Sequence, residues 1–450
     1  MPDPALITAR TLADSGRARD AAAWFARVLA ATPTNAEAAA GLARIRLAEG
    51  DLAGAVKAAS SAAEADPTAA PMLAVHRMIG LALHHAWMLE EAAPWLERAA
   101  RLEPWDATLR DFIAAGRPRP GIAPEAYDPH QGRALKRYPA REGDRYIYVI
   151  EITGTCNLRC PSCPVGNSPI GSSATGDRAV GFMDFALFER IIAKIKREAP
   201  GGAAMINLFN WGEPLLHPEL PRIIAHLRAA GLKSHLSTNL NIRRGLEEAI
   251  TANPDDMKIS ISGFTAATYS RTHKRGDIEL VKRNMRELRR LIDKHKATTH
   301  VWVCQHLYRS NQSEAEAVRR FAAELGFPYH PIPAFYMPLE RIQDVLHGRG
   351  NPNDDGIIAD LLTSPVDRQR AIAGQRGGSY DCELRFNQTV INHDGTVALC
   401  CSVYDRGNML GVNFLDENFA ALEARKYNHP FCASCMADNL HYTRPELPKT

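Results

Sequence analysis

The sequence predicts an α/β protein that is preceded by an all-α repeat domain and followed by a small α+β unit. A helical repeat occupies residues 1–115, strands alternate with amphipathic helices between residues 146 and 325, and a strand–turn–strand pattern follows at residues 388–401. A chain of 450 residues has room for roughly two to four domains.

The composition is that of an ordinary globular protein. Apolar residues make up 45% and charged residues 23%, which argues against wholesale disorder. The 54 basic and 51 acidic residues nearly balance, so the overall charge indicates neither nucleic acid nor an anionic membrane as a partner. The N-terminus lacks a signal-peptide pattern, and no apolar run approaches the ~20 residues needed to cross a bilayer. We therefore expect a cytoplasmic protein, whose nine cysteines are thiols or metal ligands rather than disulfides.

Residues 1–115 repeat internally at helical periodicity. Each copy has a turn residue, an alanine five positions later and a proline twelve positions after the alanine. These are Gly16, Ala21 and Pro33, then Gly50, Ala55 and Pro67, and then Trp87, Ala92 and Pro104. The pattern resembles the tetratricopeptide repeat, although the third copy is longer and has tryptophan in place of glycine. A plain helical bundle is the alternative, and in either case this domain binds or scaffolds.

Residues 116–140 are predicted to be a linker. Prolines stand at positions 118, 120, 124 and 129. This density of proline forbids a continued helix and is typical of a semi-rigid connection. A domain boundary is therefore expected here.

The next domain, residues 141–335, is predicted from alternating strands and helices. The expected strands are 146–152, 204–209, 233–237, 257–261 and 300–304, and the expected helices are 184–198, 218–230, 240–251, 277–295 and 313–325. This alternation is typical of consecutive βαβ units and a parallel sheet. Functional groups in such sheets collect at the carboxyl ends of the strands.

Three cysteines follow the first expected strand, at Cys156, Cys160 and Cys163 in the segment C-N-L-R-C-P-S-C. Spacings of four and three residues let three thiolates face one metal cluster from the same side. A structural zinc site or an electron-transfer cluster takes four protein ligands, whereas three ligands leave one iron open. The pattern therefore favours catalysis at an open iron, with a zinc-binding loop as the alternative.

This CxxxCxxC motif, placed at the end of the first strand of a repeating β/α unit, resembles the radical S-adenosylmethionine (SAM) superfamily. The resemblance implies a partial (β/α)6 barrel, a 4Fe–4S cluster on Cys156, Cys160 and Cys163, and SAM on the fourth iron. It also implies reductive cleavage of SAM to a 5'-deoxyadenosyl radical, which abstracts hydrogen from a substrate. The family usually has an aromatic residue before the third cysteine, where this chain has Ser162.

A second segment that matches the superfamily follows the second expected strand. Gly212, Glu213 and Pro214 match the end of the family's Gly-Gly-Glu-Pro segment, with Trp211 in place of the first glycine. The resemblance implies that this segment holds the SAM amino group, and a carboxylate such as Glu213 is a suitable acceptor for an ammonium.

Polar residues also end the third and fourth expected strands. Ser237 and Asn239 belong to a Ser-Thr-Asn segment that resembles the family's, and Ser260 ends the fourth strand. The resemblance implies that these side chains line the SAM site. Strand ends also carry serine and asparagine because these residues favour turns, which is the alternative interpretation.

A second group of cysteines lies in residues 336–450. Its members are Cys382, Cys400, Cys432 and Cys435, with Cys401 beside the second of them. Cys400 belongs to an expected hairpin and the last two form a CxxC pair, so four thiolates can close a second cluster or a zinc site. Cys401 is expected on the opposite face of its strand.

The spacing of Cys382, Gly395 and Cys400 resembles the C-terminal cluster region of the SPASM and twitch subfamilies. No cysteine follows Cys435, whereas full SPASM domains contain several more. The resemblance therefore implies one auxiliary 4Fe–4S cluster in residues 336–450, and zinc is the alternative.

Four other residues carry weaker signals. Cys304 ends an apolar strand and is expected in the core. His306, Tyr308 and Tyr336 are substrate-side groups by position, and nothing in the sequence ranks them. No general acid or base is identified.

These features predict a radical SAM enzyme and leave its substrate open. A peptide or protein is favoured because stacked helix pairs hold extended chains, and the subfamily resemblance indicates an oxidative modification. The alternative is a small molecule, such as a sugar or a natural-product intermediate, with the repeats docking a partner protein. A non-catalytic iron–sulfur or zinc scaffold is a third interpretation. The chemistry also implies a reductant such as flavodoxin or ferredoxin, and neither nucleic acid nor a membrane is expected as a partner.

Overall fold

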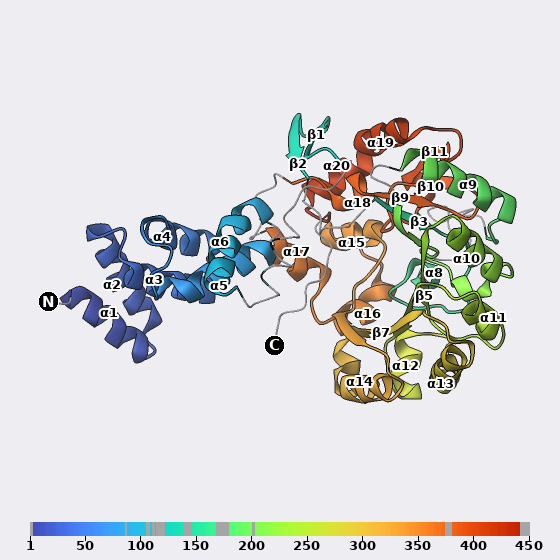
Figure 1. The fold of residues 1–450 in the computed structure, drawn as a ribbon, viewed down its shortest axis with the longest axis horizontal. Helices are drawn as coiled ribbons and strands as arrows, with labels where there is room; N and C mark the ends of the chain where they lie inside the picture. Colours follow the sequence, from blue (N-terminus) through green and yellow to red (C-terminus); the bar gives the residue numbers. More distant parts are fainter. Residues whose placement is uncertain are drawn as a thin grey trace. The chain divides into compact units, whose positions relative to one another are not determined.

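The computed structural model describes residues 3–85, 88–104, 109, 113, 122–137, 146–167, 180–199, 203–373 and 380–441 (Figure 1). The chain divides into two compact units. Unit 1 is formed mainly by Met1–Arg119, and unit 2 by Pro120–Arg137, Arg145–Ala373 and Gly378–Thr450. Among the described residues, no helix combines the length and apolar character that a membrane crossing requires.

Unit 1 consists of helical pairs, as the repeat predicts. The helices are α1 (Pro4–Asp14), α2 (Ala18–Ala31), α3 (Ala36–Ala48), α4 (Leu52–Ala65), α5 (Met72–His85) and α6 (Leu89–Leu102). Consecutive helices pack as α1 with α2, α3 with α4 and α5 with α6. Gly16 and Gly50 have φ angles of +76° and +78° at the turns within the first two pairs, a conformation that favours glycine. Ala21, Ala55 and Ala92 are buried where the helices meet, which explains their spacing.

Unit 2 is built on six parallel strands in chain order. They are β3 (Tyr146–Ile150), β4 (Ala203–Asn207), β5 (Lys233–Thr238), β6 (Asp256–Ile261), β7 (His300–Leu307) and β8 (Tyr329–Pro333). The first five confirm the expected strands, with shifts of up to three residues at their ends. Strand β8 was not predicted, because Pro331 and Pro333 interrupt its apolar pattern. The edge position of β8 accommodates these prolines.

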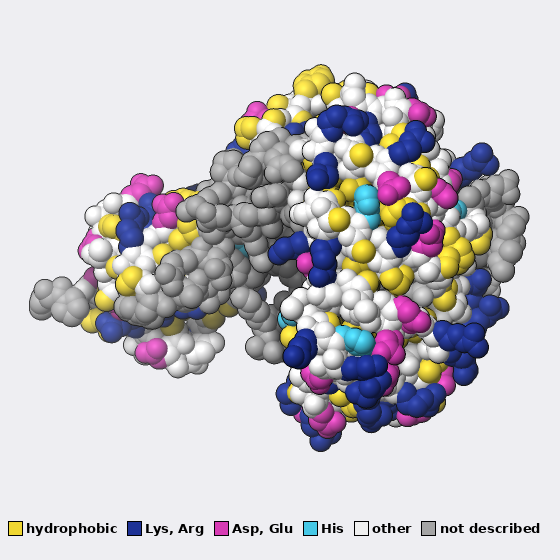
Figure 2. Space-filling model, turned by 45° about the vertical axis from the view of Figure 1, so that its right-hand side comes forward, with side chains coloured by type: hydrophobic (Ala, Val, Ile, Leu, Met, Phe, Trp, Pro, Cys, Tyr) yellow, Lys and Arg dark blue, Asp and Glu magenta, His cyan; other side chains and the backbone are white. Residues whose placement is uncertain are grey.

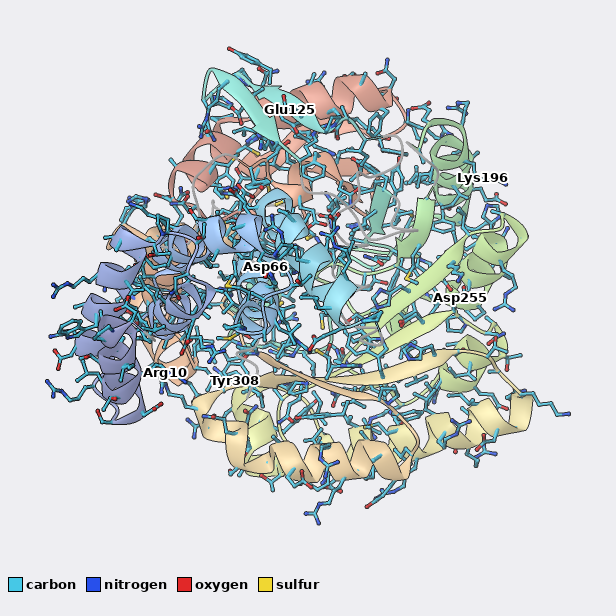
Figure 3. All side chains as sticks on the ribbon, turned by 60° about the vertical axis from the view of Figure 1, so that its left-hand side comes forward. Arg10, Asp66, Glu125, Lys196, Asp255 and Tyr308 are labelled. Atoms are coloured by element: carbon cyan, nitrogen blue, oxygen red, sulfur yellow. The ribbon has the colours of Figure 1, made fainter. Side chains whose placement is uncertain are left out.

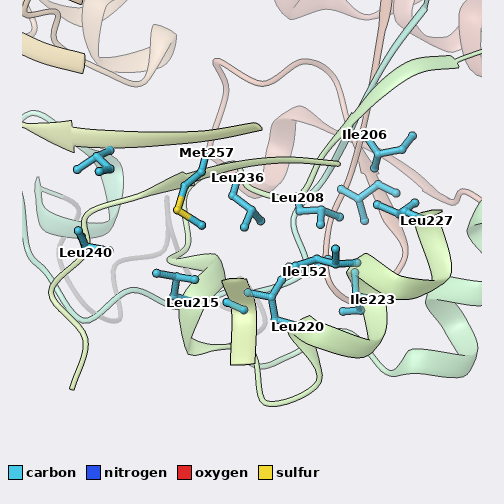
Figure 4. Packing of buried hydrophobic residues seen from close by; sticks show 14 of the residues in the cluster. Ile152, Ile206, Leu208, Leu215, Leu220, Ile223, Leu227, Leu236, Leu240 and Met257 are labelled. Atoms are coloured by element: carbon cyan, nitrogen blue, oxygen red, sulfur yellow. The ribbon is translucent and has the colours of Figure 1, made fainter. Parts of the chain in front are cut away.

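Helices cover one face of this parallel sheet. They are α9 (Phe185–Glu198), α10 (Leu220–Ala229), α11 (Leu246–Thr251), α12 (Ala266–Thr272), α13 (Ile278–His295) and α14 (Ala315–Glu324). Strand residues such as Ile206 and Leu236 pack in one buried cluster with Ile223 and Leu227 of α10 (Figure 4). We call this the helix-covered face and the opposite side the inner face.

Two of these helices differ from the prediction. The expected helix 240–251 begins only at Leu246, because residues 240–245 form a loop in which Leu240 and Gly245 have positive φ angles. Helix α12 was not predicted, since its seven residues, AATYSRT, show little apolar periodicity.

The C-terminal strands join the same sheet. They are β9 (Gln388–Ile391), β10 (Thr396–Ala398) and β11 (Met409–Asn413), and each pairs antiparallel with the next. Strand β9 pairs in parallel with β3, so the complete sheet has nine strands in the order β11-β10-β9-β3-β4-β5-β6-β7-β8. The predicted hairpin is present, but it extends the main sheet and does not form a separate one. The sequence could not show this because β3 and β9 are far apart in the chain.

Shorter elements complete unit 2. They are α8 (Pro164–Asn167), α15 (Leu339–Leu346), α16 (Asp355–Asp360), α17 (Pro365–Ala373), α18 (Glu383–Phe386), α19 (Phe419–Asn428) and α20 (Pro430–Ala437), with 3-10 turns η1 (Pro214–Leu216), η2 (Arg309–Glu314), η3 (Pro352–Asp354) and η4 (Arg406–Asn408). Lys and Arg side chains are interspersed with acidic ones on the face of unit 2 seen in Figure 2, in keeping with the balanced composition.

The segment expected to be a linker contains a β-hairpin. Strands β1 (Glu125–Asp128) and β2 (Arg133–Lys136) pair antiparallel and belong to unit 2. Asp128 at the turn is buried and forms an ion pair with Arg385 at 2.6 Å. A contact with a residue so distant in the chain overrides the local effect of the prolines, which the sequence analysis could not anticipate.

Candidate active site

The cysteine loop lies at the carboxyl end of β3. Cys156, Cys160 and Cys163 are all partly exposed, and the amide of Cys163 donates to the carbonyl of Cys160 at 3.1 Å before α8 begins. Burial and then the neighbouring thiols Cys163 and Cys156 raise the pKa of Cys160. Burial and then Glu213 raise the pKa of Cys156 to about 12. The protein therefore provides a largely buried site for three neighbouring thiols, which would become thiolates on binding a metal.

Contacts from distant segments hold the cysteine loop. The Tyr308 hydroxyl, just beyond β7, donates to Ser162 Oγ at 2.8 Å, and the Met337 amide donates to the Ser162 carbonyl at 3.1 Å. The Asn167 amide group donates both to the Pro161 carbonyl at 3.1 Å and to the Met337 carbonyl at 3.0 Å. An aromatic residue from the segment just after β7 thus contacts Ser162, the position where the superfamily usually has an aromatic.

The segment after β4 packs directly on the cysteine loop. Glu151 Oε1 accepts hydrogen bonds from the amides of Trp211 and Gly212 at 2.9 and 3.2 Å. The Glu213 amide donates to the Thr155 carbonyl at 2.9 Å. A Cβ atom on Gly212 would stand 1.7 Å from the Thr153 carbonyl oxygen, so no other residue fits there. Glu151 was not singled out in the sequence, although a carboxylate inside an apolar strand pattern is a usable signal.

Glu213 lies at the centre of this edge of the sheet. Its carboxylate accepts from the amides of Asn239 at 2.7 Å and Leu215 at 3.0 Å, and the residue is 2% exposed. Burial raises the pKa of Glu213 to about 7, and this effect outweighs the hydrogen bonds, which lower the pKa. The partners that shift this pKa are uncharged, so the structure contains a buried carboxyl group beside the cysteine loop that a cation would stabilise.

Asn239 connects the end of β5 to the cysteines. Its side-chain nitrogen, Nδ2, donates to Asn157 Oδ1 at 3.0 Å and to Cys156 Sγ at 3.6 Å. Ser237 and Ser260 lie on adjacent strands with their hydroxyl oxygens 3.4 Å apart. Pro214 is buried at the start of η1. The structure therefore brings Gly212, Glu213, Pro214, Asn239 and the three cysteines together, with Ser237 and Ser260 on the strands beside them.

The second group of cysteines lines one cavity in unit 2. Cys382, Cys400, Cys432 and Cys435 all contribute to its wall, together with apolar side chains such as Leu339 and Phe431 and the charged Arg385. Cys432 and Cys435 lie on α20, while Cys382 precedes α18 and Cys400 follows β10.

The surroundings of these four thiols are apolar. Burial raises the pKa of Cys382 to about 12, with Cys432 the next cause, and that of Cys432 to about 11. Cys401 packs instead with Val149, Val390 and Met409, so its surroundings differ from those of the four thiols. The expected reason was wrong, because β10 ends at Ala398 and neither Cys400 nor Cys401 lies on a strand.

Both sites offer the donor chemistry of iron–sulfur proteins, which is thiolate in an apolar wall. In the described part of the chain, no group of three or more His, Cys, Asp or Glu side chains has the arrangement that would hold a metal ion. Ligation by these cysteines therefore stays a prediction that rests on the donor sets and their placement.

Residues 150–306 match the radical SAM superfamily, and residues 12–79 match the tetratricopeptide repeat. The chain contains a radical SAM domain. The first match begins at the end of β3 and includes the cysteine loop, Glu213, Asn239 and Ser260. The radical SAM fold implies a 4Fe–4S cluster and SAM as cofactors. The predicted α/β architecture with N-terminal helical repeats is confirmed, and the six parallel strands form an open sheet.

Curated relatives share part of this sequence. The chain is 29% identical over 126 residues to the PqqA peptide cyclase of Xanthomonas euvesicatoria pv. vesicatoria. The aligned segment covers 27% of this chain and 31% of that protein. The chain is also 33% identical over 91 residues to the PqqA peptide cyclase of Xanthomonas axonopodis pv. citri. That aligned segment covers 20% of this chain and 22% of that protein. The chain thus spans less than a third of the length of these relatives.

Two solved structures illustrate more distant similarity. Streptococcus suis SuiB bound to the precursor peptide SuiA has 12% identity and a TM-score of 0.43, covering 79% of this chain and 72% of that one. BtrN in complex with AdoMet and 2-DOIA has 13% identity and a TM-score of 0.37, covering 65% of this chain and 86% of that one.

Proposed function

We propose that this protein is a radical SAM enzyme that modifies a peptide or protein substrate. The observation that carries the proposal is the convergence of three cysteines with Glu213 and Asn239 at one edge of the sheet, within the radical SAM domain. In this proposal Cys156, Cys160 and Cys163 hold a 4Fe–4S cluster and leave one iron to SAM. When bound, the cluster and SAM supply a 5'-deoxyadenosyl radical that removes a hydrogen atom from the substrate.

The chain's own residues bind and orient SAM in this proposal. Glu213 accepts hydrogen bonds from the SAM ammonium group, which would offset the cost of burying its carboxylate. Gly212 and Pro214 fix the path of this segment against the cysteine loop. Asn239, Ser237 and Ser260 provide polar side chains next to that loop.

We further propose that Cys382, Cys400, Cys432 and Cys435 hold one auxiliary 4Fe–4S cluster of the SPASM or twitch kind. The four thiols line one apolar cavity, which supports this assignment. Four cysteines would satisfy all four irons, so this cluster would accept an electron from the substrate or order its binding site rather than bind SAM. Zinc is the competing occupant.

A peptide substrate is supported by the peptide cyclases with which the radical SAM segment shares sequence. The repeats add support because stacked helix pairs present surfaces that hold extended chains. A small-molecule substrate, with the repeats docking a partner protein, is the alternative. A cytoplasmic location and a reductant such as flavodoxin or ferredoxin complete the proposal.

Iron analysis of three cysteine variants tests this function. Anaerobically reconstituted wild type should contain about eight irons per chain and form 5'-deoxyadenosine from SAM with dithionite. Replacement of Cys156, Cys160 and Cys163 by alanine should leave about four irons and abolish 5'-deoxyadenosine formation. Replacement of Cys382, Cys400, Cys432 and Cys435 should also leave about four irons.

Cys401→Ala is the matched control, because this thiol neighbours Cys400 but packs elsewhere. It should retain both clusters and SAM cleavage. Zinc in the second site would contradict the auxiliary cluster. Absence of SAM cleavage by wild type that holds its first cluster would contradict the catalytic function.

A further inference from the structure

The inner face of the sheet carries polar side chains just below the cysteine loop. In register across three strands, Ser237 of β5 lies beside Lys258 of β6, and Lys258 lies beside Trp302 of β7. Their neighbours Met257, Ile259, Val301 and Val303 all belong to the apolar cluster on the helix-covered face. Because side chains alternate along a strand, the row containing Lys258 points to the inner face.

Lys258 is the cation of this row, and the groups that attract it electrostatically are Cys304 and the Asp256 carboxylate. In the described part of the chain, its ammonium makes no hydrogen bond or ion pair, and it lies 5.3 Å from the centroid of the Phe209 ring. The nearby Asp256 carboxylate is engaged by the Trp302 indole at 3.0 and 2.9 Å and lies 3.6 Å from His300. Lys258 lies deep in unit 2, and burial lowers its pKa, yet its side chain keeps some accessible surface. Burial of an ammonium that makes no hydrogen bond to a carboxylate among the described residues is unfavourable, so this lysine is suited to receive an anion.

His306 provides a second polar group on the same face. His306 follows Cys304 by two residues and Trp302 by four residues on β7, so the three side chains point to the same face. The His306 ring makes no hydrogen bond among the described residues. Burial, followed by Lys258 and His273, lowers the pKa of His306 to about 3. The imidazole is therefore neutral and can donate one hydrogen bond without adding charge.

This row is close to the site proposed for SAM. Ser260 lies two residues beyond Lys258 on β6, which corresponds to about 6.6 Å along the strand. Ser260 in turn neighbours Ser237, and Asn239 two residues further on contacts Cys156. Cys304 is buried as expected, but it lies in register with Ser260, is influenced electrostatically by Lys258, and belongs to none of the apolar clusters among the described residues. A group bound at Lys258 would therefore lie beside the reacting part of the molecule.

We propose that Lys258 and His306 bind a carboxylate of the substrate, and that the substrate is a peptide which presents an aspartate or glutamate side chain to this face. That the substrate is a peptide rests on the proposed function. One ammonium and one neutral imidazole match a single negative charge. A phosphate dianion would leave excess buried charge, which makes it the poorer fit.

Two matched peptides test the proposal on the reconstituted full chain. The probes are acetyl-Ala-Ala-Glu-Ala-Ala-amide and the same peptide with glutamine, and binding is measured by isothermal titration calorimetry with SAM present. Wild type should bind the glutamate peptide at least about tenfold more tightly, as expected for a charge-assisted hydrogen bond. Lys258→Met should bind the two peptides equally. The control Lys196→Met removes an exposed lysine of α9, labelled in Figure 3, and should keep the preference.

A measurement on wild type alone covers the case in which Lys258→Met does not fold. Acetylation of Lys258 by acetic anhydride, followed by mass spectrometry, should be slowed by the glutamate peptide and not by the glutamine peptide. Equal binding or no binding of both peptides by wild type would overturn the proposal. Tighter binding of inorganic phosphate than of the glutamate peptide at Lys258 would also overturn it. Formation of 5'-deoxyadenosine in the same preparation tests the proposed function separately, because neither binding nor acetylation requires SAM cleavage.

Discussion

Arg385 is a buried cation held between two carboxylates. Its guanidinium lies 2.6 Å from both Asp128 and Asp381, and all three side chains are at most 1% exposed. Asp381 also contacts Arg137, at 3.3 Å. Arg385 lines the cavity of the auxiliary cysteines as well, so it joins the β1–β2 hairpin to that site.

Arg385→Met should destabilise unit 2 by about 3–5 kcal/mol, because two buried carboxylates would lose their shared cation. Urea unfolding of the cofactor-free protein measures this loss. The exposed pair of Arg289 and Asp293 provides a control, since Arg289→Met should cost less than about 1 kcal/mol. A loss at Arg385 as small as that of the control would show that the buried network contributes little.

The residue scale also shows what sequence reading can and cannot find. Cys156, Glu213 and Asn239 were predicted from their motifs, and the structure brings them into one network. Tyr308 was noted only by position, and its contact with Ser162 depends on the ends of β3 and β7 meeting. Lys258 carried no signal, because a lysine in a strand is ordinarily read as an exposed residue.

At the scale of elements, the loop after β4 and the loop after β3 form one interlocked structure. Gly212 allows this contact, because its Cα lies against the Thr153 carbonyl with no room for a side chain. The Glu213–Thr155 backbone hydrogen bond follows immediately. The loops therefore depend on each other for their positions.

Gly212→Ala should separate these loops and reduce SAM binding at least about tenfold, with a loss of about 1–3 kcal/mol in stability from overpacking. Equilibrium dialysis with labelled SAM and urea unfolding measure the two effects. Gly356→Ala in α16 is the control, because a Cβ there would meet no atom within 4 Å. Unchanged SAM affinity in Gly212→Ala would contradict the proposed role of this loop.

For the whole molecule, the apolar clusters are distributed between the two units. Residues of α3 to α6 form one cluster and residues of α1 to α3 another, whereas β3 to β8 and their helices form a third. As far as the described residues go, each of these three clusters draws its buried residues from one unit. Units with separate cores can unfold separately.

Calorimetry of the full chain should therefore show two transitions, and cluster binding should raise only the one that belongs to unit 2. Comparison of the wild type that contains its iron–sulfur clusters with the variant lacking Cys156, Cys160 and Cys163 identifies that transition. A single transition that shifts as a whole would show that the two units unfold cooperatively.

Local patterns were sufficient to predict the repeats, the first five parallel strands and both cysteine groups. Short-range physics produces these features: helical periodicity, strand propensity, and the spacing that lets thiols face one site. Three features required the folded chain. They are the pairing of β9 with β3, the burial of Asp128 against Arg385, and the placement of Lys258 on the inner face. Each depends on contacts between residues distant in the chain or on which face of the sheet is covered, and local propensity contains no information about either.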